Sequence, residues 1–476
     1  MFAQLTHRGI RLSVAAEQLL KEKNPNELIF QKILDLKKPI IDEQDIKKIL
    51  EENPQLLAEV IRQDAFLPLA KEYEPRIQLY PNRDVTGKSR TKGEVDNFVN
   101  NFRDRFDRIS KFLKRANSGT ITLEDAKTHI GEKVRVIVMI NEKSQSKKGN
   151  LILDIEDLGG KFKVVITQNK ANEDLVNKAR GVLKDEIIAI SGKMAEAYLI
   201  AEDIEWPDLP IVREKKTVDV DLAIAYLSDL HFGSRFFLGE KLDEFANWIN
   251  GKGEAKDLAG KVKYIIVAGD VVDGIGVYPN QEKELSVKDI YSQYKLFDEF
   301  VEKIPDHVEI IVAPGNHDAV RRGEPQPALG TDLVKSDVIR VGNPSVVGIE
   351  GLKHLIYHGT SMDSMIANVP GLSYKYPEKV MVEYLKRRHL SPIYGGNLIV
   401  PENTDYLVVE EVPDIMHSGH VHKNGYTKYR GTLIINSGTF QAQTDFQLKQ
   451  GHIPTPALVP IYEMKYDRLK TLDFNQ

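Results

Sequence analysis

The first part of the chain repeats its apolar residues at helical spacing. Three groups carry this pattern, at 10–19, 29–36 and 46–50, and asparagine and proline residues interrupt it between them. Asp42 stands just before the third group, where a helix N-cap is expected. The pattern therefore predicts a helical module over residues 1–62. Two roles are open for it, a compact accessory domain and a nucleic-acid-binding unit.

Residues 63–93 and 94–118 differ in their patterns. The first stretch contains three prolines and a polar, basic sequence, which predicts a linker. The second has an apolar stripe at steps of three and four, which predicts a connecting helix with a basic opposite face. That face is either solvated or in contact with phosphates. The stripe comprises Val95, Phe98, Phe102, Phe106, Ile109 and Leu113, and the basic face Arg103, Arg105, Arg108, Lys111, Lys114 and Arg115.

Between residues 119 and 212 the apolar residues form five short runs that are typical of β-strands. A helix is predicted at 172–183, after the third run. Three strands, a helix and two strands is the element order of an OB-fold barrel. Many such barrels bind single strands, but few aromatic residues interrupt these runs, so a protein-docking or structural role is equally open. The runs are 134–140, 150–158, 161–167, 186–194 and 197–204.

From 213 to 476 short apolar runs alternate with helical patterns. The runs are rich in β-branched residues, as is typical of buried strands in an α/β sandwich. We therefore expect a multi-domain α/β protein, in which this sandwich follows an OB-fold barrel and the helical module. The runs are AIAYLS at 223–228, YIIVAG at 264–269, VEIIVA at 308–313, HLIYHG at 354–359, YLVVE at 406–410 and TLIINSG at 432–438.

Composition narrows the possible functions. With 476 residues and 41% hydrophobic content the chain is long enough for several cores, and its formal net charge of −5 argues against general binding to nucleic acid. The absence of cysteine excludes disulfides, zinc–thiolate sites and cysteine nucleophiles. No signal peptide or membrane-spanning run is recognisable. We therefore expect a cytoplasmic protein without a membrane partner.

Five polar motifs carry the candidate chemistry, each where an apolar run gives way to a turn. Strand ends are where ligand sites gather in open α/β sheets. Side chains two apart on a strand point the same way, which predicts that Asp229 and His231 face one point and that His420 and His422 do so too. The motifs are Asp229-Leu230-His231, Gly269-Asp270, Gly315-Asn316-His317-Asp318, Tyr357-His358-Gly359 and Gly419-His420-Val421-His422.

The residue types in these motifs predict a metal centre. Carboxylate, amide and imidazole groups without a thiolate suit Mn²⁺, Fe²⁺, Zn²⁺ or Ni²⁺. Asp270 stands between two groups of candidate ligands and is the natural bridge of a two-cation cluster, which clamps phosphates. Each motif alone is a weak signal, but the ordered set is unexpected by chance. We expect two divalent ions, with Mn²⁺ favoured and Mg²⁺ a further alternative.

Segment 220–445 resembles the calcineurin-like metallophosphoesterases through these five motifs. The resemblance implies that Asp270 bridges the two cations. It also implies that His317 stabilises the transition state or protonates the leaving oxygen, and that Asp318 orients His317. The remaining implied ligands are Asp229, His231 and His422 for one cation and Asn316, His358 and His420 for the other.

The whole order of domains resembles the small subunits of archaeal family D DNA polymerases. The strings LSDLHFGSRFF, GDVVDGIGVYP, PGNHDAVR, YHGTSMD and SGHVHKNGY are similar to that family. The resemblance implies a proofreading 3′–5′ exonuclease that acts on DNA with a 3′ end and pairs with a large polymerising subunit; a sliding clamp is a further candidate partner. Related eukaryotic subunits have lost metal ligands, and the full set here implies an active enzyme. The competing hypotheses are a stand-alone metallophosphatase or repair nuclease, and a structural subunit with a vestigial site.

Several other polar and aromatic residues have two interpretations each. Arg321 and Arg322 are either substrate contacts or a solvated pair. The basic run 385–389 is either a solvated helix end or a DNA-tracking patch. Phe232, Phe236 and Phe237 are core residues by default, with base stacking as the alternative, and His354, His389 and His417 are expected to be structural.

Overall fold

A computed structural model describes residues 5, 10–23, 27–53, 66–117, 119–214, 216–449 and 451–475. The chain divides into two compact units, Met1–Pro68 and Leu69–Gln476. No helix in the described ranges is long and apolar enough to cross a membrane.

The smaller unit is helical, as predicted. The residue before α4 is Asp42, whose carboxylate accepts a hydrogen bond from the backbone N–H of Asp45 at 2.9 Å, so the expected N-cap is confirmed. Ile46, Ile49 and Leu50 are buried on one face of that helix. The predicted breaks at 24–26 and 54 lie outside the described residues. The elements are α2 (Val14–Lys23), α3 (Glu27–Asp35), α4 (Glu43–Glu52) and a parallel pair, β1 (Arg11–Leu12) and β2 (Ile40–Ile41).

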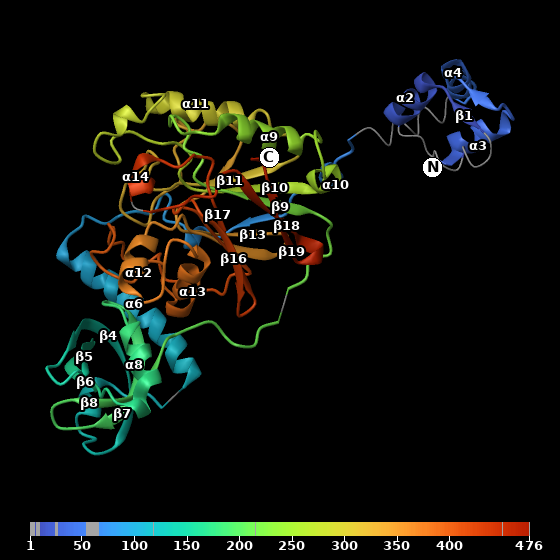
Figure 1. The fold of residues 1–476 in the computed structure, drawn as a ribbon. Helices are drawn as coiled ribbons and strands as arrows, with labels where there is room; N and C mark the ends of the chain where they lie inside the picture. Colours follow the sequence, from blue (N-terminus) through green and yellow to red (C-terminus); the bar gives the residue numbers. More distant parts are fainter. Residues whose placement is uncertain are drawn as a thin grey trace. The chain divides into compact units, whose positions relative to one another are not determined.

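The larger unit is built around two six-stranded sheets (Figure 1). Four neighbouring strands of the first sheet, β12 to β9, are parallel; β14, β15 and β17 of the second are parallel too. In sheet order, the first comprises β12 (Ile339–Arg340), β11 (Glu309–Ala313), β10 (Val262–Ala268), β9 (Ala223–Leu227), β18 (Leu458–Glu463) and β19 (Arg468–Asp473). The second comprises β16 (Asn424–Tyr429), β17 (Thr432–Ser437), β15 (Ile415–Ser418), β14 (Leu352–Ile356), β13 (Ser345–Ile349) and β3 (Ile77–Leu79).

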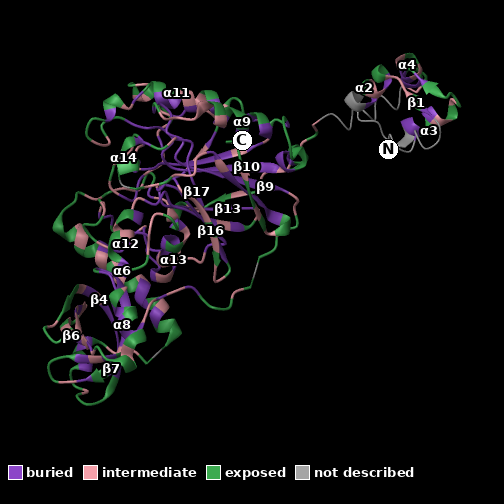
Figure 2. Cartoon of the chain, viewed as in Figure 1, coloured by how far each residue is buried: buried purple, intermediate pink, exposed green. Residues whose placement is uncertain are grey.

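The two sheets enclose one apolar core. Along β10 every residue is buried, and alternate side chains such as Tyr264 and Ile266 join Ile356 and Ile435 of the second sheet in one cluster. The central strands, such as β9 and β10, accordingly appear as buried in Figure 2, whereas the edge strands β16 and β19 are partly exposed. Several helices complete the domain, with α12 and α13 packed on the outer face of the second sheet. They are α9 (Gly239–Ile249), α10 (Lys256–Ala259), α11 (Ile290–Val301), α12 (Met362–Asn368) and α13 (Pro377–Arg387); a one-turn helix, α14 (Asp445–Lys449), follows later.

Two predictions need correction here. Residues 406–410, predicted as a strand, form no strand: the backbone N–H of Val409 donates to the Arg388 carbonyl and the N–H of Leu390 to the Leu407 carbonyl, so the segment pairs with the turn after α13 instead of a sheet. The stretch predicted as a linker contributes β3, which pairs with β13. The run at 406–410 has the apolar, β-branched composition of a strand because its residues are buried, not because they belong to a sheet.

The five predicted strands of the middle segment close into a barrel, and the predicted helix follows the third of them. Their order, β4-β5-β6-β8-β7, is the OB-fold order. The inward-facing residues, among them Val136, Leu153 and Ile190, form one core with α7 and α8. The elements are α7 (Leu123–Ala126), β4 (Lys133–Gln145), β5 (Leu151–Asp157), β6 (Gly160–Ile166), α8 (Glu173–Arg180), β7 (Ile187–Met194) and β8 (Leu199–Glu205).

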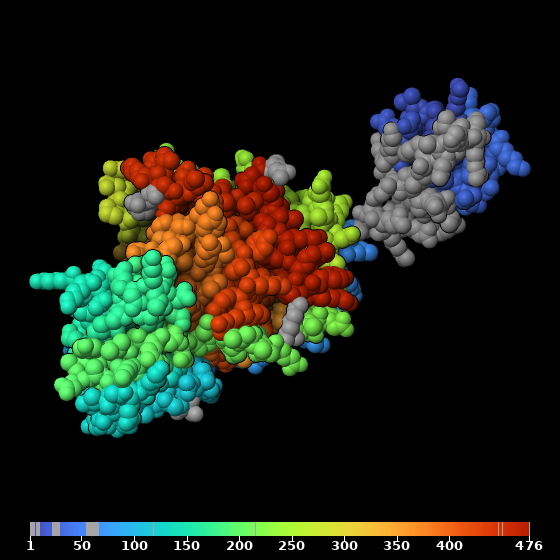
Figure 3. All heavy atoms as spheres, turned by 60° about the horizontal axis from the view of Figure 1, so that its bottom comes forward, coloured from blue at the N-terminus to red at the C-terminus, as the bar shows by residue number. Residues whose placement is uncertain are grey.

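The helix α6 (Val95–Ala116) joins the barrel to the sandwich. Its Ile109 and Leu113 pack with Ile137 of the barrel and with Val408. Figure 3 shows the barrel side by side with the part of the sandwich that contains α12 and α13. The predicted apolar stripe is therefore confirmed over its buried part, although Val95 is exposed.

Part of the basic face of α6 is buried, contrary to both interpretations of it. Arg105 is 1% exposed, and its Nε lies 2.7 Å from Oδ2 of Asp405. Arg108 pairs with Glu410 at 3.0 Å. Burial by itself raises the pKa of Asp405, but the charges of Arg105 and His389 hold that pKa far below its usual range. These arginines connect domains and do not face solvent or a ligand.

The basic run at the end of α13 is largely buried, so a solvated helix end does not describe it. Arg387 is 2% exposed and its Nε lies 2.8 Å from Oε2 of Glu186 in the barrel. Arg388 is 3% exposed, and its guanidinium lies 4.2 Å from the ring centroid of Phe112 in α6. A run of charges thus lies at the junction of barrel and sandwich.

We expect Arg105→Ala to destabilise the larger unit by about 3–5 kcal/mol, because it leaves the carboxylate of Asp405 buried and unpaired. Urea unfolding followed by circular dichroism measures the loss. Arg103→Ala, which removes an exposed charge from the same helix, is the control and should change stability little. Equal unfolding curves for the two variants would show that the buried ion pair does not hold α6 in place.

Candidate metal centre

All the site motifs lie in loops at the carboxyl ends of parallel strands. Asp229 and His231 follow β9, Asp270 follows β10, and Asn316 follows β11. In the second sheet His358 follows β14, while His420 and His422 follow β15. Because parallel strands end at the same edge, the two sheets bring these loops together. The prediction that the motifs gather at the ends of the strands is therefore confirmed.

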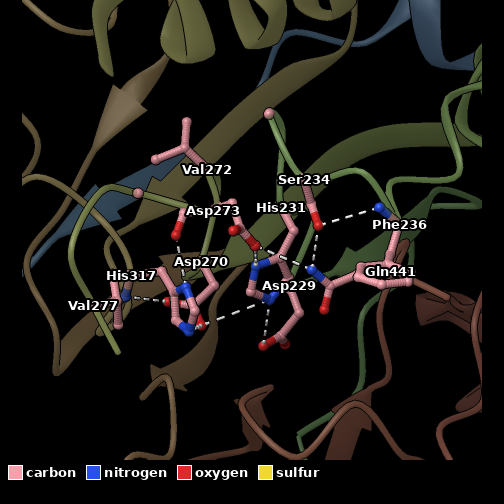
Figure 4. Close-up of polar contacts among 12 residues, drawn as sticks. Asp229, His231, Ser234, Phe236, Asp270, Val272, Asp273, Val277, His317 and Gln441 are labelled. Atoms are coloured by element: carbon pink, nitrogen blue, oxygen red, sulfur yellow. Dashed lines mark hydrogen bonds and ion pairs between the residues drawn. The ribbon is translucent and has the colours of Figure 1, made fainter. Parts of the chain in front are cut away.

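The first group of candidate ligands comprises Asp229, His231 and His422. Nε2 of His231 lies 3.0 Å from Nε2 of His422, which in turn lies 3.4 Å from Oδ1 of Asp229. All three residues are buried, and Figure 4 shows the His231 ring beside the Asp229 carboxylate. Three donor atoms thus meet at one point, as ligation of a single cation requires.

The second group comprises Asn316, His358 and His420. The side-chain oxygen of Asn316 lies 3.0 Å from Nε2 of His358 and 3.0 Å from Nδ1 of His420. His420 and His422 therefore face different groups, although they are two residues apart. The prediction that they point the same way is wrong, because this segment is not a strand.

Asp270 lies between the two groups. Its Oδ2 is 3.3 Å from Nε2 of His358 in one group and 3.9 Å from Nε2 of His231 in the other. Its Oδ1 accepts a hydrogen bond of 2.8 Å from the backbone N–H of His317. The carboxylate is 2% exposed. This is the position that a bridging ligand would occupy.

Five of these side chains stand on left-handed backbone. Non-glycine residues adopt positive φ rarely, and such strained residues cluster at functional sites. Left-handed backbone also turns Asp229 and His231 toward one point without the strand that was expected to do so. The φ angles are 51° for Asp229, 55° for His231, 50° for Asp270, 72° for His420 and 53° for His422.

Neighbouring groups fix the orientation of the histidine rings. Nδ1 of His231 lies 3.0 Å from Asp273, Nδ1 of His358 lies 2.8 Å from the Ala268 carbonyl, and Nε2 of His420 lies 3.1 Å from Asp363. Such outer partners hold a metal-binding ring in place. Asp273 also accepts a hydrogen bond from Gln441 (Figure 4).

Neither Asp273 nor Asp363 was identified from the sequence. Asp273 comes three residues after Asp270 in the same turn, and a second carboxylate so close to a candidate ligand was a usable signal. Asp363 belongs to helix α12, and no local pattern distinguishes it from a solvated helix residue. Only the packing of α12 against the second sheet brings it to His420.

The predicted role of Asp318 needs correction. Its carboxylate accepts hydrogen bonds from the backbone N–H of Gly315 at 2.8 Å and from the hydroxyl of Tyr294 at 3.0 Å, so it braces the loop after β11. The His317 ring is held instead by the carbonyl of Asp273, 2.8 Å from its Nδ1. Burial raises the pKa of Asp318 to about 6.

Without a cation, the buried carboxylates of the site are balanced by protonated histidine, whose proton a bound cation would replace. Burial alone raises the pKa of Asp270, but the charges of His358 and His317 hold that pKa well below its usual range. Burial likewise opposes ionisation of Asp229, and a hydrogen bond with His422 lowers its pKa. Conversely, Asp270 overcomes the burial of His358 and raises its pKa to about 10. Both carboxylates are therefore ionised at neutral pH.

The centre opens into a cavity of about 280 Å³. His317 lines it with 16% of its side chain exposed, whereas the side chains of Asp229 and His358 are 0% exposed. The opposite wall contains Tyr374 and His452, whose ring centroids are 3.7 Å apart. A substrate can therefore reach His317 and the donor atoms from one side.

Most of the other candidates lie outside this cavity. Phe232 packs against Phe237 and Phe297, as the core interpretation predicted. His354, His389 and His417 are buried, and they hydrogen-bond Tyr226, Asp405 and Ser437 respectively.

These residues fit a pair of divalent cations. Four imidazole nitrogens, two carboxylates and one amide oxygen converge, and their buried His/Asp clusters are typical of a two-metal phosphoesterase centre. The α/β sandwich and this centre are those of a metal-dependent phosphoesterase. Residues 222–424 match the calcineurin-like phosphoesterase family.

The relatives specify the class further. The chain is 44% identical over 393 residues to a DNA polymerase II small subunit of Archaeoglobus fulgidus. The aligned region covers 80% of this chain and 78% of that relative. The chain is 40% identical to the small subunit of Methanocaldococcus jannaschii and 38% identical to that of Methanothermobacter thermautotrophicus. The aligned regions cover 68% and 82% of those relatives, respectively. The chain therefore belongs to the family of archaeal DNA polymerase II small subunits, and the resemblance found in its sequence is confirmed.

Proposed function

We propose that this chain is the 3′–5′ exonuclease subunit of a DNA polymerase and removes nucleotides from the 3′ end of DNA. One observation carries the proposal: the seven predicted donor side chains lie together, five of them lining one cavity and Asp229 and His358 buried against those, in a family named for a polymerase subunit. A structural subunit with a vestigial site would not need five donors on strained backbone, four of them buried. The name of the relatives is also the basis for expecting a larger polymerising partner.

The proposed division of roles follows the geometry. Asp229, His231 and His422 would hold one cation. Asn316, His358 and His420 would hold the other, and Asp270 would bind both. When bound, two divalent cations, with Mn²⁺ expected, neutralise charge on the phosphate and supply a nucleophile at neutral pH. His317 would face the substrate through Nε2, because Nδ1 is engaged by the Asp273 carbonyl.

A second recess supports a polynucleotide substrate. It has a volume of about 260 Å³ and shares Asn316 and Asp363 with the first cavity. Arg322 lines it, while Arg321 is bound to Glu402 and to the carbonyl of Pro325. The two arginines are thus not equivalent, and Arg322 is the one placed to contact the phosphate of the next nucleotide.

We expect Arg322→Ala to raise KM for an oligonucleotide about tenfold and to leave the hydrolysis of bis(4-nitrophenyl) phosphate unchanged, since the small diester does not reach the recess. Steady-state kinetics on both substrates measures this. Arg235→Ala is a matched control, because Arg235 is also exposed, also donates to a backbone carbonyl and lines neither cavity. Equal KM values for the two variants would exclude this phosphate contact.

The proposed function is tested with a primer whose last base is mismatched, labelled at either end, with Mn²⁺ and with or without the large subunit. We expect release of the 3′ label as a mononucleotide and stepwise shortening of the 5′-labelled strand. A chelator should stop both. Internal cleavage alone, or removal only of a terminal phosphate, would instead indicate a repair nuclease or a phosphatase.

A further inference from the structure

A cavity of about 910 Å³ lies at the junction of the barrel and the sandwich, away from the metal centre. We call it the junction pocket. Its walls are the end of α6, the segment that leaves the barrel after β8, and the end of α13, and Trp206 and Arg388 line it. A volume of this order suits a small-molecule ligand of nucleotide size.

Arg388 is a buried cation whose hydrogen-bonding capacity is only partly used. Its side chain is 3% exposed. Nη2 donates to the Glu410 carbonyl at 2.6 Å, whereas Nε and Nη1 have no acceptor among the described residues. The ring of Phe112 offsets some of the charge but accepts no conventional hydrogen bond. Buried donors without acceptors are costly, so this arrangement favours an anion in the pocket.

Four more cations line the same pocket; of these, Lys178 pairs with Asp203 at 2.6 Å and Arg430 with Asp208 at 2.9 Å. Arg115, at the end of α6, is exposed. Lys386 lies over the ring of Trp206, with Nζ 4.1 Å from the ring centroid. Arg115 belongs to α6, whereas Lys386 is in the last turn of α13, two residues before Arg388. Positive groups from two elements, α6 and the end of α13, suit a phosphate, which offers several acceptor oxygens.

Each carboxylate of the pocket is paired with another arginine, although Asp208 and Glu410 also act on Arg388 and raise its pKa against the lowering effect of burial. Glu205 pairs with Arg135 at 2.8 Å. Glu410 pairs with Arg108 at 3.0 Å. Asp208 pairs with Arg430, also a lining residue, at 2.9 Å. Lys386 also lies 3.6 Å from Glu383, so the excess positive charge of the pocket rests on Arg115 and Arg388.

We propose that the junction pocket binds the phosphate group of a nucleotide or nucleic-acid strand, with Arg388 at its base and Arg115 and Lys386 at its rim. The site is independent of the metal centre and of the exonuclease proposal. It would place a phosphate where the barrel meets the sandwich, on residues of α6 and α13 that also hold the two domains together. Occupation of the pocket would thereby stabilise that junction.

Tryptophan fluorescence provides a direct test. The chain has two tryptophans; Trp206 lines the pocket, whereas Trp248 is buried in α9. The intact chain is titrated in excess chelator, so that phosphates cannot be held by cations at the metal centre. The probes are inorganic pyrophosphate, thymidine monophosphate, a short oligothymidylate and, as a carboxylate anion, citrate.

We expect saturable binding of the phosphate probes, weaker by about tenfold or more in Arg388→Gln and by several-fold in Arg115→Ala and Lys386→Ala. Arg103→Ala on α6 and Lys379→Ala on α13 remove exposed charges from the same helices, away from the pocket, and should bind as the unchanged chain does. The two rim variants keep the test valid should Arg388→Gln fail to fold.

The probes also distinguish the source of the phosphate. Tighter binding of the oligothymidylate than of the mononucleotide would assign the pocket to a strand, and equal binding would assign it to a free nucleotide. Absence of binding, equal loss in the control variants, or preference for citrate would overturn the proposal.

Discussion

Asp270→Asn should abolish hydrolysis and leave the fold intact. Asparagine has the same shape and can still accept the hydrogen bond from the backbone N–H of His317, but it lacks the charge that would hold two cations together. The loss should exceed the roughly 10–100-fold effect of removing an outer partner of a metal ligand. Cleavage of a labelled primer, metal analysis and circular dichroism measure the three quantities.

Asp273→Asn is the matched control for this variant. Asp273 is also a buried aspartate of the same turn, but it contacts the outer nitrogen of His231 and not the point where the donors meet. We expect it to weaken metal binding within that 10–100-fold range and to recover with added Mn²⁺. An Asp270→Asn chain that kept two ions and its activity would refute the bridging assignment.

His317→Ala should lower turnover by about 10²–10⁴-fold while the bound metal stays unchanged. The ring lines the cavity, and its Nε2 lies 4.0 Å from Oδ2 of Asp270, near the donors without belonging to either group. Single-turnover cleavage beside metal analysis of the same preparation separates the chemical effect from ligand loss.

His452→Ala is the control for His317, because His452 lines the same cavity without contacting the donor set. It should turn over at a rate close to that of the unchanged chain. If His317→Ala lost an ion, or if added Mn²⁺ restored its rate, His317 would be a ligand and the division of roles would be wrong.

The sequence predicted the site because its signals are local. A buried β-branched run followed by a polar turn identifies a strand end, and parallel strands end together, so the motifs around Asp229, Asp270 and His358 were expected to meet. Asp42 was recognised as an N-cap for the same kind of reason. What decides such features is within a few residues of them.

Other features depend on contacts between distant segments and could not be predicted. The left-handed backbone of His420 and His422 turns them to different groups, where strand geometry predicted one direction. The run at 406–410 has the composition of a strand but finds its hydrogen bonds at the turn after α13. Arg105 and Arg387 looked solvated because their buried partners, Asp405 and Glu186, are far away in the sequence.

The central claim is that the converging donors hold two cations that together hydrolyse phosphodiester bonds. The most direct test adds Mn²⁺ stepwise to the metal-free chain and measures bound ions and primer cleavage in the same samples. The account predicts that cleavage rises with the fraction of chains that hold two ions. Full cleavage with one bound ion, or cleavage that persists in chelator, would contradict it.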